Sequence, residues 1–179
     1  MSINNDRKPV FIRIINTISE ISGYLSGIAL FAAALIIFYK VAVRYIFGSP
    51  TIWQTELSIY LLMFGAFVGA AYGLKHDAHV NVDIALMILP ERIRKGLRIV
   101  TSFIGLVLTV FVAYRGWHMW WHATSEGWTS ETLWGPPLTY PYFILPLGMT
   151  LVSLQFIVII FEDIRRFKNG GDHANESAS

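Results

Sequence analysis

Four long apolar runs, none of which contains Asp, Glu, Lys, Arg or His, constrain this chain more than any other feature. They cover Ile21 to Tyr39, Leu57 to Leu74, Ile99 to Tyr114 and Pro141 to Phe161. A helix over the last run would be about 31 Å long at about 1.5 Å per residue, which matches the roughly 30 Å hydrocarbon core of a bilayer. The runs therefore predict an all-α membrane protein with four transmembrane helices.

The composition supports this interpretation and excludes several other classes of protein. The 179 residues are 54% hydrophobic and only 15% charged, whereas soluble domains average about 25% charged residues. There is no cysteine, so disulfides, thiolate metal sites and redox chemistry by protein thiols are excluded. The formal net charge of +2 gives no indication of a nucleic-acid partner.

We expect one transmembrane domain over residues 21–164, with a short segment on either side. Its helices are placed at about 21–43, 55–75, 96–118 and 141–163. The apolar core of the first helix is longer than the roughly 7 to 15 residues of a cleaved signal peptide, so this helix should be retained. Residues 1–20 should form a cytoplasmic N-terminal segment, and the polar residues 165–179 a disordered cytoplasmic tail.

The distribution of basic residues predicts the orientation of the helices. Of the 14 Lys and Arg residues, all but Lys40, Arg44 and Arg115 lie in the terminal segments or between the second and third helices. The positive-inside rule therefore places both termini in the cytoplasm. Between the second and third helices, "VNVDIALMILPERIRKG" combines an apolar stretch with basic residues, which predicts an amphipathic segment on the membrane surface.

Two groups of glycines predict close helix packing. Gly65, Gly69 and Gly73 are spaced by four residues on the second predicted helix, as are Gly23 and Gly27 on the first. Glycines with this spacing leave one helix face without side chains, so that another helix can approach closely. The partner is either a helix of the same chain, which we favour, or a helix of another protein.

Aromatic residues gather at the predicted outer interface. All six tryptophans lie there, at positions Trp53, Trp117, Trp120, Trp121, Trp128 and Trp134. Aromatic belts usually form at both interfaces, so a belt explains only part of this asymmetry. Membrane anchoring and protein docking both remain open, and Trp117, Trp121, Trp128 and Trp134 are the candidate docking surface.

A short connection joins the first two helices and brings two opposite charges to similar depth. Arg44 follows the first helix, and Glu56 opens the second, where exposed backbone amides favour a carboxylate. With Trp53 they form a predicted outer-edge cluster, in which Arg44 and Glu56 pair. The alternative is an exposed ion pair of small energetic value beside an ordinary interfacial tryptophan.

The histidines raise a second possible function, the haem-binding membrane anchor of an oxidoreductase. His118 and His122 are four residues apart and share a helix face, and His76 and His79 form another close pair. The predicted orientation puts the two pairs about 30 Å apart, so no single haem joins them. We therefore favour interfacial histidines and keep the haem-binding anchor as the alternative.

The interiors of the four runs lack the ionisable residues that transporters and pumps place near the middle of the bilayer. By itself the chain therefore shows no translocation path. This disfavours a stand-alone transporter or membrane enzyme.

The region "RYIFGSPTIWQTELSIYLLMFGAFVGAAYGLKHDAHVNVD" resembles the small membrane subunit of tripartite ATP-independent periplasmic (TRAP) transporters, the DctQ-like family. The matching residues are Arg44, Tyr45, Trp53, Glu56, Gly65, Ala66, His79, Val82 and Asp83, followed by Pro90. Together with the glycine stripe they give the candidate partner-interface or scaffold residues, Arg44, Trp53, Glu56, Gly65, Gly69, Gly73, His79 and Asp83. The loop before the fourth helix is richer in Trp and Pro than the family pattern.

The resemblance implies a subunit without catalytic residues, cofactor or metal, in a bacterial inner membrane. Its partners would be a large multi-span membrane subunit, which carries the substrate and sodium sites, and a periplasmic substrate-binding protein. Membrane lipids would surround it, and no nucleic acid is implied. The transported organic acid remains open, because selectivity belongs to the other two proteins.

Overall fold

The structure is a computed structural model that describes residues 9–48, 51–77 and 91–176. Its four long helices are α1 (Val10–Phe47), α2 (Trp53–Asp77), α4 (Glu91–Ser125) and α5 (Thr139–Glu176). Each contains a stretch long and apolar enough to cross a membrane. The prediction of an all-helical protein with four apolar helices is thus confirmed. The predicted amphipathic segment lies mostly outside the described residues.

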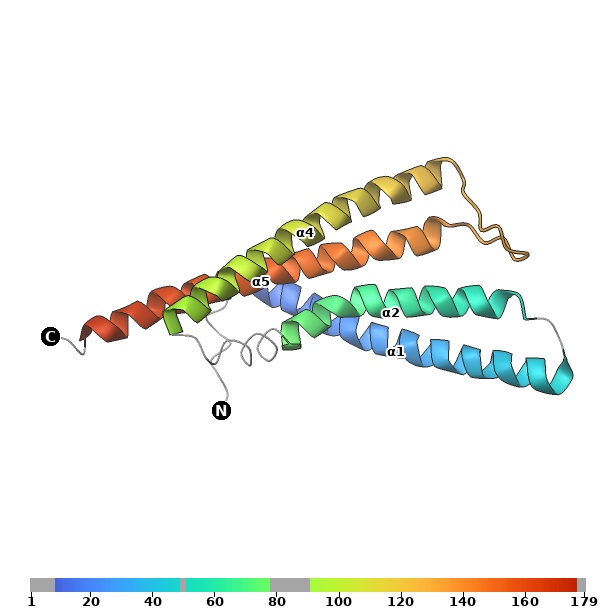
Figure 1. The fold of residues 1–179 in the computed structure, drawn as a ribbon, viewed down its shortest axis with the longest axis horizontal. Coiled ribbons are helices and arrows are strands. Elements are labelled where there is room, and N and C mark those ends of the chain that lie inside the picture. Colours follow the sequence, from blue (N-terminus) through green and yellow to red (C-terminus); the bar gives the residue numbers. More distant parts are fainter. Residues whose placement is uncertain (1–8, 49–50, 78–90, 177–179) are drawn as a thin grey trace.

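The helices form two hairpins, α1 with α2 and α4 with α5, that join into a row rather than a closed bundle. Along this row the order is α1, α2, α5, α4 (Figure 1). We call the end with the α1–α2 and α4–α5 connections the loop end, and the opposite end the terminal end. The hairpins converge toward the terminal end, where Ile12 and Ile15 of α1 pack against Val158 of α5.

The helices are longer than the apolar runs that they contain. With 38 residues, α1 is about 57 Å long at about 1.5 Å per residue, well beyond a roughly 30 Å bilayer core. It therefore either tilts or extends past the core. Gly48 ends it with a φ of 61°, a left-handed conformation that glycine adopts at little cost.

A stripe of mainly small side chains on α1 faces the neighbouring helices. Its buried members are Ile12, Ile15, Ser19, Ser22, Ser26, Ala29 and Ala33. They recur at intervals of three and four residues, the spacing typical of helices that cross at a shallow angle. In a membrane, where lipid is as apolar as Leu, such helices associate through close van der Waals packing, which small residues permit.

The glycines of α2 fit against side chains of α1. A Cβ atom added to Gly65 would lie 2.5 Å from Leu30, and one added to Gly69 would lie 3.0 Å from Cβ of Ser26. The predicted packing within the chain is therefore present at these two positions.

The glycines of α1 differ from each other in this respect. A Cβ atom at Gly23 would lie 2.3 Å from the Tyr72 ring, whereas one at Gly27 would have nothing within 4 Å. Gly73 lies half-buried on α2. Gly23 thus belongs to the contact between α1 and α2, but Gly27 does not.

The closest backbone approach joins the two hairpins at α2 and α5. A Cβ atom at Gly148 of α5 would lie 2.5 Å from the backbone oxygen of Phe67 on α2. Pro146, two residues before Gly148, is fully buried. Sequence analysis did not select Gly148, because it stands alone and has no glycine four residues away.

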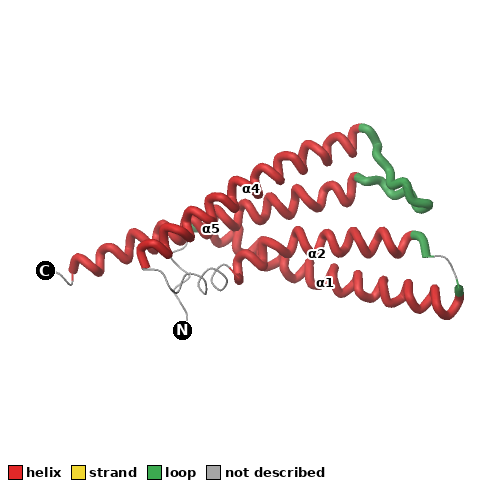
Figure 2. Tube along the Cα trace, in the orientation of Figure 1, coloured by secondary structure: helices red, strands yellow, loops and turns green. Residues whose placement is uncertain are grey.

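The α4–α5 loop has a defined shape. Gly127, with a φ of 65°, follows the end of α4, and the Trp128 amide donates to the Ala123 carbonyl at 2.9 Å. This is a Schellman motif, which satisfies carbonyls at the helix end. Thr129 and Pro137 form an isolated antiparallel bridge, and the loop runs toward the side of α5 on which α2 lies (Figure 2).

We predict that Gly148→Ala lowers the stability of the folded protein by about 1 to 3 kcal/mol, the usual cost of overpacking, because its methyl group meets backbone rather than a movable side chain. Gly27→Ala is the matched control, since its methyl group enters open space and alanine favours helices. The midpoint of thermal unfolding in detergent measures both. Equal midpoints for the two variants would contradict the close α2–α5 approach.

Candidate partner-contact sites at the two ends of the helices

At the loop end, one carboxylate joins the start of α2 to the α4–α5 loop. Glu56 lies in the first turn of α2 and is only 9% exposed. Its Oε1 accepts a hydrogen bond from the Ser130 hydroxyl, and its Oε2 accepts one from the Thr132 hydroxyl at 2.8 Å. Hydrogen bonds to a charged group contribute more than neutral ones, so Glu56 fixes the loop against α2.

Arg44 is not a partner of this carboxylate. Within residues 9–48, 51–77 and 91–176, no ion pair joins Arg44 to Glu56, and Arg44 lies exposed on α1. Trp53 begins α2 and is 42% exposed. The structure therefore replaces the expected Arg44–Glu56 pair with contacts from a loop more than 70 residues further along the chain. No sequence pattern near Glu56 indicates that hydroxyl groups so distant in the chain will bind it.

The tryptophans lie at the start of α2, in the last turns of α4 and in the α4–α5 loop, which all belong to the loop end. Trp117 and Trp120 pack edge to face with ring centroids 5.4 Å apart, and both contact Phe143 of α5. Trp121 is 65% exposed on α4. Trp117 and Trp120 thus pack between α4 and α5 near the loop.

The loop carries the remaining two candidate docking residues. Trp128 donates its indole N–H to Glu126 at 2.6 Å and packs against the Tyr142 ring. Trp134 is 44% exposed, and its neighbour Leu133 is 90% exposed. The loop thus presents Leu133 and Trp134 to the outside, while Thr132 is held by α2 and Trp128 packs on α5.

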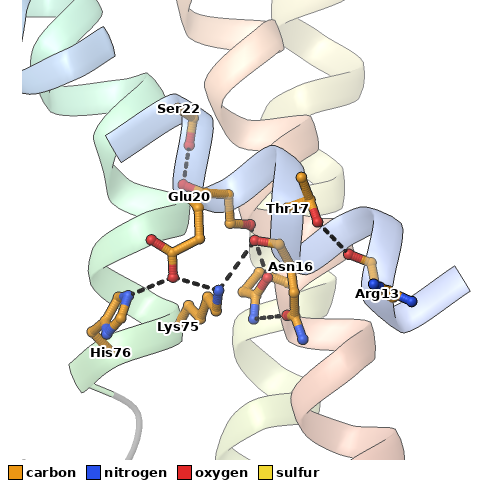
Figure 3. Close-up of polar contacts among 9 residues, drawn as sticks. Arg13, Asn16, Thr17, Glu20, Ser22, Lys75 and His76 are labelled. Carbon is orange, nitrogen blue, oxygen red and sulfur yellow. Dashed lines mark hydrogen bonds and ion pairs between the residues drawn. The ribbon is translucent and has the colours of Figure 1, made fainter. Parts of the chain in front are cut away.

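A second polar cluster ties α1 to α2 at the terminal end (Figure 3). Lys75 of α2 donates to Glu20 Oε1 of α1 at 2.6 Å and to the Asn16 carbonyl at 3.1 Å. His76 Nε2 lies 3.0 Å from the same Glu20 oxygen, and its ring packs on Tyr72. Glu20 therefore lies between two groups of α2 that carry or can acquire positive charge.

The contacts continue from this cluster to α5. Gln155 of α5 is buried, accepts a hydrogen bond from the Ser19 hydroxyl at 2.9 Å, and places its amide 3.4 Å from the Asn16 side chain. On the other side of the row, Arg98 of α4 pairs with Asp163 of α5 at 3.0 Å. Two basic residues that the positive-inside rule counts, Lys75 and Arg98, are thus partly neutralised within the chain.

The histidines lie at both ends of the helices, as expected. His118 and His122 of α4 lie at the loop end, with ring centroids 4.7 Å apart, and His76 belongs to the terminal-end cluster. The described part of the chain contains no group of three or more His, Cys, Asp or Glu side chains arranged to hold a metal ion. His79 and Asp83, both candidate interface residues, fall outside the described residues.

We predict that Glu56→Ala releases the α4–α5 loop. Since the chain has no cysteine, a spin label on a single Leu133→Cys substitution reports loop motion directly. The label should become more mobile in Glu56→Ala, less so in Glu56→Gln, and remain unchanged in Arg44→Gln. Loss of two hydrogen bonds to a carboxylate, at about 1.5 to 3 kcal/mol each, should also cost about 3 kcal/mol or more of stability. An equal effect of Arg44→Gln would restore the hypothesis of an Arg44–Glu56 pair.

For the terminal-end cluster we predict non-additive effects. Glu20→Gln or Lys75→Met alone removes one charge from a half-buried pair and should cost about 1 to 2 kcal/mol, between the values for exposed and buried pairs. The double variant should lose less than the sum, because neither charge is left uncompensated. Thermal unfolding of all four proteins measures the coupling, and strict additivity would show that the pair is energetically inert.

Comparison with known proteins identifies the family. Residues 33–166 match the family model described as "Tripartite ATP-independent periplasmic transporters, DctQ component". The C4-dicarboxylate TRAP transporter small permease protein DctQ of Vibrio cholerae is 26% identical, over 86% of this chain and 75% of that protein. The sialic acid TRAP transporter small permease protein SiaQ of the same species is 27% identical, over 83% of each chain.

A longer protein contains a similar region. The sialic acid TRAP transporter permease protein SiaT of Haemophilus influenzae is 27% identical over 53% of this chain, which is only 15% of SiaT. These similarities favour a transporter subunit over the alternative of a haem-binding anchor. Because the family model covers most of its length, the chain belongs to the DctQ family and is a non-catalytic small permease subunit of a TRAP transporter in a membrane.

Proposed function

We propose that this subunit is a fixed scaffold for the large membrane subunit of its transporter and helps to dock a periplasmic substrate-binding protein. The system would import an organic acid with sodium across a bacterial inner membrane. The names of the relatives include C4-dicarboxylate and sialic acid transporters, both of which handle organic acids. The sodium and substrate sites would lie on the large subunit.

One observation carries the scaffold role, the division of the row into an apolar middle and two polar ends. Glu56 with its loop hydroxyls lies at one end, and Glu20, Lys75 and the pair of Arg98 with Asp163 lie at the other. The four runs between them contain no ionisable side chain apart from tyrosine. Such a body offers no ionisable binding group near the bilayer centre, where transporters hold them, but it can support a partner that does.

The open row also suits a scaffold. In a closed bundle, α1 and α4 would meet and hide their faces, whereas here they form the two edges (Figure 1). Large apolar side chains such as Phe31 and Phe38 on α1, and Phe103 and Phe111 on α4, are more than half exposed. Both faces and both edges are therefore free for lipid or for a large membrane partner.

The restrained α4–α5 loop supports docking of the substrate-binding protein at the loop end. Glu56 holds Ser130 and Thr132 of the loop on α2, while the next two residues, Leu133 and Trp134, are exposed. A pre-ordered loop loses less conformational entropy on binding than a free one. With the orientation inferred from the basic residues, this end faces the periplasm, where the substrate-binding protein would arrive.

We predict the orientation as follows. Reporter enzymes fused after Gly127 should show periplasmic activity, and those fused after Glu91 or Gly170 should show cytoplasmic activity. Paired reporters, one active only in each compartment, provide the internal control. The opposite pattern would place the loop end in the cytoplasm and exclude it as a docking site for a periplasmic protein.

The proposed function predicts that this chain is inactive alone and required in the complex. Purification through a tag on this chain should recover a large multi-span membrane protein in equal amount. Proteoliposomes with both subunits and the cognate binding protein should take up substrate in a sodium gradient, while each subunit alone should not. Uptake by the small subunit alone, or full uptake without it, would exclude a scaffold role.

A further inference from the structure

The last two turns of α4 carry a histidine pair for which the scaffold role has no use. His118 and His122 lie four residues apart, and their ring centroids are 4.7 Å apart with planes inclined by 48°. Both side chains are exposed. We propose that this pair is a chelating site for a divalent transition-metal ion such as Zn²⁺ or Cu²⁺.

The spacing of the rings suits one shared ion. Side chains four residues apart lie on the same helix face, with Cβ atoms about 5 to 6 Å apart. Two imidazole nitrogens bound to one Zn²⁺, each at about 2.0 to 2.1 Å, must lie roughly 3 Å apart. Rings with centroids 4.7 Å apart reach that separation through side-chain rotation alone, without a change in the helix.

The Glu126 carboxylate already orients the His122 ring. His122 Nδ1 lies 3.5 Å from Glu126 Oε1. A metal-bound histidine usually donates the N–H of its second ring nitrogen to such a carboxylate. The other oxygen of Glu126 accepts from the Trp128 indole at 2.6 Å, and Trp128 packs on Tyr142 of α5. This chain of contacts leaves Nε2 of His122 for the ion.

The chemistry of the pair selects the class of ion. Imidazole binds Zn²⁺, Cu²⁺ and Ni²⁺, whereas Mg²⁺ and Ca²⁺ require oxygen ligands. Because the described residues contain no third metal-binding side chain grouped with the pair, water or a partner protein would fill the other positions. The pair is thus an open site with two protein ligands, and it does not depend on the transport role proposed above.

His76 differs from this pair and serves as the control. Its Nε2 lies 3.0 Å from the Glu20 carboxylate, and its ring packs on Tyr72. Because its ring contacts Tyr72 and not a second histidine, His76 offers an ion one imidazole nitrogen rather than two. His76→Ala should therefore leave metal binding unchanged.

Calorimetric titration of the full chain with ZnCl₂ tests the site. The protein should carry an affinity tag without histidine and be kept at about pH 7.5, because imidazole binds metals in its neutral form. Wild type and His76→Ala should bind one Zn²⁺ alike. His118→Ala and His122→Ala should each weaken binding at least about tenfold, the lower limit for loss even of an outer-shell partner, and MgCl₂ should not bind.

Two further measurements separate chelation from nonspecific uptake. Glu126→Gln should weaken Zn²⁺ binding about tenfold if it orients His122. Cu²⁺ added to wild type should give an electron paramagnetic resonance spectrum with coupling to two nitrogens, which His118→Ala reduces to one. Unchanged Zn²⁺ affinity in folded His118→Ala, verified by circular dichroism, or the absence of any Zn²⁺ binding to wild type, would overturn the proposal.

Discussion

The close approach of α2 and α5 at Gly148 is the contact on which the assembly of the two hairpins depends. It brings the Phe67 backbone within reach of α5, and among the described residues α2 and α5 make the most extensive contact between the hairpins. In lipid, the gain from such a contact is van der Waals packing, which falls steeply with distance. A residue without a side chain is therefore required where two backbones meet.

Polar groups reinforce this contact at both ends of the helices. The Glu56 carboxylate fixes the loop between α4 and α5 to the start of α2, and the cluster around Glu20 ties α1 to α2 and, through Gln155, reaches α5. Glu20 and Lys75 stay partly exposed, so the cost of burying these two charges is smaller than for a fully buried pair. The middle of the row can then remain apolar while its ends are held by charge.

This arrangement explains how a subunit whose four apolar runs contain no Asp, Glu, Lys, Arg or His can serve a transporter. Exposed apolar faces along the row suit lipid and a large membrane partner, and the loop end presents a shaped surface with tryptophans. Membership of the DctQ family places the chain in a tripartite system, in which another subunit can supply the binding groups that the four apolar runs lack. The histidine pair on α4 adds a chemical feature at the same end that packing and docking do not require.

The sequence by itself determined the all-helical class, the four apolar helices and the family, because hydrocarbon length and the need to satisfy backbone hydrogen bonds leave few solutions for such runs. It also indicated contacts at Gly65 and Gly69, since their spacing defines a helix face. Only the tertiary structure decided the order of the row, the role of Gly148 and the partners of Glu56. Ser130 and Thr132 are distant from Glu56 in the chain, and Arg44 was the nearer opposite charge. Local spacing predicts which residues share a helix face, but which distant segment meets that face depends on how the hairpins pack.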